Sequence, residues 1–212
     1  RFIDLGYTTP KPLIEIDKIP MVVRAAKSLP EADQWIFICR YNHIKNYNID
    51  KVLIDYFPGA LILSVNKLTD GQASTCLLAR EHLFPDDRLT IGACDNTMVY
   101  SKEDYNEKIE RNDALIWTFR NNPSVLRNPN MYGWVQVDPS GKANRVSCKI
   151  PISDQPMNDH AVVGAFSFKR AEDFLESADT MINKNRRVSN EFYLDVVMDE
   201  YLLKGYNIIP LE

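Results

Sequence analysis

Short apolar runs rich in β-branched and aromatic residues recur through the first half of the chain, at residues 34–40, 60–65, 88–94 and 114–119. Runs of this length and composition predict buried strands. Stretches with apolar residues at helical spacing lie between them, at residues 19–29, 48–57 and 71–84. Because strands that alternate with helices are typical of βαβ units, the pattern predicts an α/β fold, with a Rossmann-like, mixed and mostly parallel sheet flanked by helices.

The second half of the chain has a different pattern. Polar and apolar residues alternate on both sides of a Pro-Ser-Gly turn within residues 132–150, which predicts a β-hairpin insertion. A strand is expected at 160–168, and helices at 169–185 and 190–205, the last ending at a glycine. We interpret residues 1–212 as a single domain. We also expect it to be part of a longer polypeptide, because it begins with Arg1 and ends within an apparent strand.

Composition narrows the class of protein. Hydrophobic residues make up 45% of the 212 residues and charged residues 25%, as in ordinary globular proteins, and the net charge of −4 argues against a nucleic-acid partner. No apolar run approaches the ~20 residues that a membrane helix needs, so no membrane partner is expected. The widely spaced cysteines, Cys39, Cys76, Cys94 and Cys148, indicate reduced thiols of a cytoplasmic protein.

One run of apolar residues ends at an acid, where a buried strand is expected to end. The run "LTIGAC" stops at Asp95, which Asn96 and Thr97 follow. An aspartate there can cap its own turn. It can also be a ligand at the carboxyl end of a sheet strand, where open α/β folds place their chemistry. Both interpretations remain open on this stretch alone.

Two loops could face a phosphate or a nucleotide. Lys11 lies between Pro10 and Pro12, which stiffen its backbone, so it suits a phosphate, or it is an ordinary exposed lysine. Gly71 precedes small residues that open a helix. Free N–H groups there could face an anion or a base, or the small residues could simply allow close packing.

The predicted helix at 190–205 carries acids at spacing four, Glu191, Asp195 and Asp199. Such acids share a helix face if the helix starts early enough, and the alternative to a functional site is a solvated acidic stripe. Lys149, which ends the second hairpin strand, and His160, which opens the next strand, are each more often structural than functional.

Taken in order, these pieces resemble a known family. "PKPLIEID", "GQASTCLLA", "LTIGACDN", "HAVVGAFSF" and "NEFYLDVVMDEYLLKGY" are similar to segments of the nucleotidyltransferases that act on sugar phosphates and related phosphorylated small molecules. The likeness covers nearly the whole chain, and "KIPISD" and "DHAVVG" are similar to the branch found in capsule and surface-polysaccharide loci. It implies a fold like that of the nucleotide-diphosphosugar transferases. Of the family's N-terminal strand and glycine-rich loop, only Arg1 and Phe2 remain here.

The resemblance implies a role for each candidate residue. It places Arg1 and Lys11 on the triphosphate or the transferred phosphate, and Lys149 on the phosphate of the acceptor. Asp95 and Asp195 correspond to the family's metal-binding aspartates, which implies Mg²⁺ as the cofactor. Gly71 and Gln72 fall where the nucleotide-base pocket is built. Cys148 stands where the family often has a glutamate that contacts a sugar hydroxyl.

The reaction implied joins a nucleoside triphosphate to a phosphorylated acceptor, with release of pyrophosphate, to make precursors of capsule or surface polysaccharide. The capsule-like segments favour CTP, and the acceptor is a sugar phosphate or a non-sugar such as phosphocholine or a phosphorylated amino acid or amide. A homo-oligomer is left open. The alternatives are a glycosyltransferase of the related fold, which usually needs Asp-x-Asp where this chain has Asp95-Asn96-Thr97, and a non-catalytic sensor of nucleotides.

Overall fold

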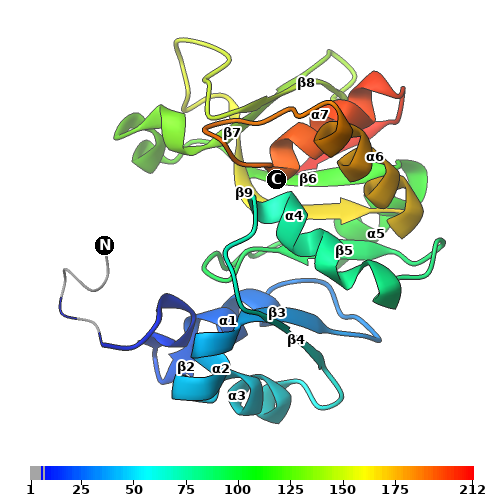
Figure 1. Ribbon diagram of the computed structural model, residues 1–212. Coiled ribbons are helices and arrows are strands. Elements are labelled where there is room, and N and C mark those ends of the chain that lie inside the picture. The colour runs from blue at the N-terminus through cyan, green and yellow to red at the C-terminus, as the bar shows by residue number, and fades with distance from the viewer. Residues whose placement is uncertain (1–5, 7) are drawn as a thin grey trace. The chain divides into compact units, whose positions relative to one another are not determined.

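The computed structural model describes residue 6 and residues 8–212, so Arg1 lies outside the described residues. The chain divides into two compact units (Figure 1). Unit 1 runs to Leu68 and also includes Gly92–Val99, and unit 2 comprises Thr69–Ile91 and Tyr100–Glu212. Each predicted site residue therefore belongs to one of two separately packed bodies.

Unit 1 is a small α/β body. Its strands β3 and β4 pair in parallel, its short strands β1 and β2 pair antiparallel, and a 3₁₀ turn at Lys11–Leu13 precedes them. The elements are β1 (Glu15–Ile16), β2 (Ile19–Pro20), α1 (Met21–Lys27), β3 (Ile36–Arg40), α2 (Tyr41–Tyr47), α3 (Ile49–Tyr56) and β4 (Leu61–Val65). The rings of Trp35, Phe37 and Phe57 pack together, with centroids 4.8–6.0 Å apart. These aromatic contacts join the parallel strand pair to the segment that follows α3.

Unit 2 is built on a mixed six-stranded sheet with the order β10-β6-β9-β7-β8, and β5 also pairs with β9. The strands are β5 (Leu89–Gly92), β6 (Ala114–Phe119), β7 (Gly133–Val137), β8 (Ala143–Cys148), β9 (His160–Phe168) and β10 (Ile208–Leu211). β10 runs parallel to β6, whereas β9 is antiparallel to both β6 and β7. The predicted hairpin is β7 and β8, and it belongs to this sheet because β7 also pairs with β9.

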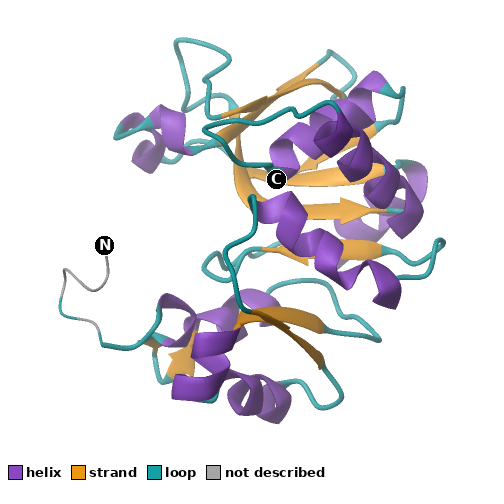
Figure 2. Cartoon of the chain, in the orientation of Figure 1, coloured by secondary structure: helices purple, strands orange, loops and turns teal. Residues whose placement is uncertain are grey.

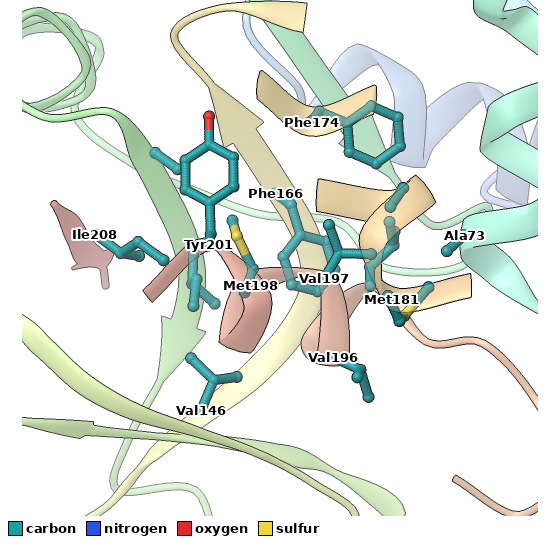
Figure 3. Close-up of a cluster of buried hydrophobic side chains, with 14 of the residues drawn as sticks. Ala73, Val146, Phe166, Phe174, Met181, Val196, Val197, Met198, Tyr201 and Ile208 are labelled. Atoms are coloured by element: carbon teal, nitrogen blue, oxygen red, sulfur yellow. The ribbon is translucent and has the colours of Figure 1, made fainter. Parts of the chain in front are cut away.

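Helices lie beside the strands of unit 2 (Figure 2). They are α4 (Gln72–Cys76), α5 (Lys102–Arg111), α6 (Ala171–Asn183) and α7 (Leu194–Leu203), and a 3₁₀ segment at Leu77–His82 follows α4. Phe166 of β9, Phe174 of α6 and Tyr201 of α7 are almost fully buried in the main core cluster (Figure 3). The apolar faces of α6 and α7 thus cover the sheet and fix the start of α7, where one candidate residue lies.

The predicted mixed α/β fold is confirmed. The helix expected at 190–205 begins at Leu194 instead, because Ser189 and Asn190 have φ values of 48° and 66° and form a tight turn closed by the Val188–Glu191 bridge. Glu191 therefore lies before the helix, so the early start that Glu191 and Asp195 need in order to share a helix face does not occur. Of the described residues, none belongs to a helix that is both long and apolar enough to cross a membrane.

Candidate functional site

Lys11 and Asp95 form an ion pair within unit 1, although 84 positions separate them in the sequence. Lys11 begins the 3₁₀ turn that Pro10 and Pro12 favour, and Asp95 lies just beyond the end of β5. Both side chains remain partly exposed, 40% for Lys11 and 29% for Asp95. The structure thus joins two of the candidate residues, and the role of Asp95 as a ligand stays a prediction.

Lys149 is held by Tyr193 within unit 2. The Lys149 ammonium donates a hydrogen bond to the Tyr193 hydroxyl at 2.6 Å, and this bond raises the pKa of Lys149 above its ordinary value. Lys149 follows the last residue of β8 with φ of 60°, and its backbone N–H donates to the carbonyl of Tyr132. The left-handed backbone turns the chain out of the sheet here, which fixes the position of the Lys149 backbone. The hydrogen bond to Tyr193 favours the charged form of the side chain.

Asp195 lies in the first turn of α7 and is only 8% exposed. Burial raises the pKa of its carboxyl group to about 6, while the Cys148 thiol donates a hydrogen bond to the carboxylate. Its Oδ1 atom is buried and has no hydrogen-bond partner among the residues that the structure describes. A Cβ atom at Gly133 of β7 would overlap Oδ1, so this oxygen packs directly against the backbone of the glycine.

Gly71 is required by a close approach of two backbones. Its φ of 125° and ψ of −176° disfavour other residues, and a Cβ atom there would lie 2.6 Å from both the N and O atoms of Phe192. The Phe192 N–H donates to the carbonyl of Asp70 at 2.7 Å, and the Ala73 N–H donates to the Phe192 carbonyl at 3.0 Å. The packing interpretation thus explains the glycine, and the same bonds fix Gln72 at the start of α4.

The structure brings the predicted residues together in two sets. One set lies around segment 191–195 of unit 2: Gly71 and Lys149 contact this segment, and Asp195 belongs to it. The other set is the pair of Lys11 and Asp95 in unit 1. Within the described part of the chain, no group of three or more His, Cys, Asp or Glu residues forms a metal site by itself. The hypothesis that Asp95 and Asp195 share a cation therefore stays a prediction.

Some residues at these sites were not predicted. Gly133 packs against Asp195, and Tyr193 accepts a hydrogen bond from Lys149. A glycine at the start of a strand can indicate a close backbone contact. The pairing of Tyr193 with Lys149 has no such signal in the sequence. His160 has a structural role, since its ring shares a hydrogen bond of 2.9 Å with Thr118 across β6 and β9 and burial lowers its pKa.

Solved structures share this fold. A nucleoside-diphosphate-sugar pyrophosphorylase from Vibrio cholerae RC9 matches with a TM-score of 0.79 at 20% identity, over 99% of this chain and 86% of that one. The inositol-1-phosphate CTP transferase from T. maritima matches with a TM-score of 0.71 at 12% identity, over 98% and 78%. A UDP-glucose pyrophosphorylase complexed with UDP-glucose matches with a TM-score of 0.68 at 16% identity, over 100% and 85%.

The chain has the fold of these proteins. The resemblance to sugar-phosphate nucleotidyltransferases that the sequence motifs indicate is thus confirmed at the level of the fold. No family model matches the sequence, and no curated protein matches it either.

Proposed function

We propose that the protein is a nucleotidyltransferase that joins a nucleoside triphosphate to a phosphorylated small molecule and releases pyrophosphate. The observation that carries the proposal is the Lys11–Asp95 pair, which lies beyond a strand end in a chain with the fold of pyrophosphorylases. Carboxyl ends of strands are where open α/β folds place ligands. The Lys149–Tyr193 pair adds a second fixed cation for a second phosphate.

The donor set fits a divalent cation that prefers oxygen. Asp95 is partly exposed and pairs with the ammonium of Lys11, and its carboxylate oxygens are of the kind that Mg²⁺ prefers. Asp195 offers a buried carboxylate whose Oδ1 atom has no hydrogen-bond partner among the described residues. Mg²⁺ keeps several water molecules and takes one or two carboxylates together with substrate phosphates, so a cluster of three protein acids is not needed. When bound, the ion would neutralise phosphate charge.

The lysines do the remaining electrostatic work. A phosphate oxygen of the acceptor forms a bond to the α-phosphorus of the triphosphate, and the bond from that phosphorus to the leaving pyrophosphate oxygen breaks. Because both reactants are anions, they must be neutralised and held in line. Lys11 would contact the triphosphate and Lys149 the acceptor phosphate. Tyr193 accepts a hydrogen bond from Lys149, which raises the pKa of Lys149 and limits the freedom of its side chain. Gly71 and Gln72 would receive the nucleotide base, and Arg1 would contact the triphosphate.

We propose CTP as the nucleotide and a non-sugar or sugar phosphate as the acceptor, used in the cytoplasm for surface-polysaccharide precursors. One structural match is named an inositol-1-phosphate CTP transferase, which supports CTP. Cys148 is buried and its thiol points to Asp195, so position 148 supplies no carboxylate for a sugar hydroxyl. That arrangement supports non-sugar acceptors such as phosphocholine.

Pyrophosphate release tests the proposal. CTP, UTP, GTP and dTTP would each be incubated with a panel of phosphorylated sugars, polyols, amines and amino acids, with Mg²⁺ or with a chelator. We expect release with one nucleotide and one acceptor class, and only with the divalent cation.

The Asp95→Asn variant should lower that rate by about a hundredfold or more, since an electrostatic contact at the reacting groups is removed. Asp55→Asn, which changes an exposed acid on α3 of the same unit, is the control and should keep the wild-type rate. Release by Asp95→Asn at the wild-type rate, or no release from any pair of substrates, would overturn the proposal.

A further inference from the structure

Arg187 touches several parts of unit 2 at once. Its Nη2 atom pairs with the Asp70 carboxylate at 2.9 Å, and its guanidinium carbon lies 3.9 Å from the centre of the Phe192 ring. Its Nη1 atom donates to the Asn190 carbonyl at 3.0 Å, and Nε donates to the Asn185 side chain at 2.8 Å. The side chain is 27% exposed, so most of it is enclosed by these partners. We call these contacts the Arg187 clamp.

The partners of the clamp stand next to proposed site residues. Asp70 immediately precedes Gly71, and Phe192 immediately precedes Tyr193. The two segments are also joined directly, since the Phe192 N–H donates to the Asp70 carbonyl and the Ala73 N–H to the Phe192 carbonyl. The absence of a side chain at Gly71 allows this approach. The two segments are therefore joined twice, by backbone hydrogen bonds and by the side chain of Arg187, which contacts Asp70 and Phe192.

The clamp also braces a strained turn. Ser189 and Asn190 both have positive φ, and Val188 and Glu191 exchange two backbone hydrogen bonds of 3.0 Å across them. This is the pattern of a tight turn that normally uses glycine or asparagine, and serine fits it poorly. Because Arg187 donates to the Asn190 carbonyl, it holds this turn in the conformation that sends the chain toward Tyr193 and α7.

We propose that Arg187 is a positioning residue that fixes the nucleotide side of the site, Gly71 and Gln72, against the acceptor side, Tyr193 and Lys149. This inference rests on the proposed function, which defines the nucleotide side and the acceptor side. A planar guanidinium can pair with a carboxylate, lie over an aromatic ring and donate to a carbonyl at the same time, whereas an ammonium on a flexible chain cannot hold all three partners. A lysine at this position would keep the charge and lose the geometry.

The test compares Arg187→Lys, Asp70→Asn and the double variant with the wild-type protein. Hydrogen exchange of the Ala73 and Phe192 amides reports the junction itself, and steady-state kinetics report its use. We expect both amides to exchange about tenfold faster in each variant, as expected when a contact worth about 1.4 kcal/mol is removed. KM for both substrates should rise about fivefold to tenfold, while kcat stays within about twofold. The double variant should be no worse than Arg187→Lys alone, because Arg187→Lys already removes the pairing with Asp70.

Arg120→Lys is the matched control, since Arg120 pairs with Glu212 through two nitrogen atoms in the same unit and touches neither segment. It should leave both amides and both KM values unchanged. Unchanged exchange in Arg187→Lys, faster exchange with unchanged KM, or additive effects in the double variant would overturn the inference. If the wild-type protein releases no pyrophosphate, the proposed function fails, whereas the exchange rates still decide whether Arg187 joins the two segments.

Discussion

The two units carry their candidate acids in opposite surroundings. In unit 1, Asp95 lies past a strand end, remains partly exposed and pairs with the cation of Lys11. In unit 2, Asp195 lies in the first turn of α7, is almost completely buried and has one oxygen without a partner among the described residues. The same side chain is therefore stabilised by charge in one unit and enclosed against the backbone of Gly133 in the other.

This contrast indicates how each acid should respond to change. An exposed ion pair contributes little to folding, typically less than about 1 kcal/mol, so unit 1 can alter Asp95 without losing its core. A buried carboxylate loses its contacts with water, so its stability depends on the groups packed around it. Substitutions near Asp195 should consequently act on folding first, and substitutions near Asp95 on ligand binding first.

The largest effect on folding is expected from Gly133→Ala. The added methyl group would overlap Asp195 Oδ1 and lie 3.1 Å from Val162, and both neighbours sit in a packed core that cannot easily move. We expect the free energy of unfolding to fall by about 3 kcal/mol or more, the upper end of the usual cost of core overpacking. Urea unfolding followed by circular dichroism measures the loss.

Gly141→Ala is the control for this variant. Gly141 lies in the turn of the same hairpin with φ of 85°, and nothing lies within 4 Å of an added Cβ. Only the backbone strain should be felt there, about 1 kcal/mol. Equal losses in the two variants would show that the enclosure of Asp195 is not what makes unit 2 sensitive.

The second largest effect is a pH dependence of the free energy of unfolding, which Asp195→Asn should remove. The carboxyl pKa is raised from its ordinary value of 3.8 to about 6 by burial. A raised pKa means that the folded state holds its proton more tightly, so the contribution to stability is complete below about pH 4 and is lost as the pH rises through about 6. At about 1.4 kcal/mol per pKa unit, the loss approaches roughly 3 kcal/mol at pH 7.5.

Urea unfolding of both proteins between pH 4 and pH 7.5, with a chelator present, measures this difference. The stability of Asp195→Asn relative to wild type should increase across that range, because the amide does not ionise. Parallel curves for the two proteins would contradict the prediction and remove the distinction between the two acids.

The sequence was informative where one pattern dominates. The continuous apolar runs that predicted β3, β4, β6 and β9 lie in these strands within one or two residues. Helix α5 was not predicted because its sequence is largely charged, and only Tyr105 and Ile109 are buried. The late start of α7 was missed because Ser189 and Asn190 adopt left-handed conformations without a glycine to signal them.

For the candidate site, too, the sequence indicated some features and not others. The candidate residues were found through short motifs, but the contacts that give them their properties connect distant positions. Lys11 meets Asp95 and Lys149 meets Tyr193, across 84 and 44 positions, and neither pairing follows from local periodicity. The buried environment of Asp195, a residue of helix α7, depends on Gly133 of strand β7. Tertiary packing, which no local pattern encodes, decides these properties.

A smaller effect is expected from Tyr193→Phe in unit 2. This substitution removes the hydroxyl that accepts the hydrogen bond from Lys149, so the pKa of Lys149 should fall back toward its ordinary value. Stability should change by only about 1 kcal/mol, the usual value for one hydrogen bond. KM for the acceptor should rise about fivefold, measured by pyrophosphate release. Tyr132→Phe, whose hydroxyl lies 3.5 Å from Ser124, is the control and should leave KM unchanged.

The smallest effect on folding is expected from Asp95→Asn in unit 1. The substitution removes the charge that pairs with Lys11 but keeps the size of the side chain, and both partners are partly exposed to solvent, which screens their attraction. The free energy of unfolding should therefore change by less than about 1 kcal/mol, even though this is the variant for which we propose the largest loss of turnover. Urea unfolding at pH 7.5, beside Asp195→Asn under the same conditions, measures the contrast. If Asp95→Asn lost several kcal/mol, the acid would be a structural support of unit 1, and its loss of turnover would no longer be evidence for a ligand site.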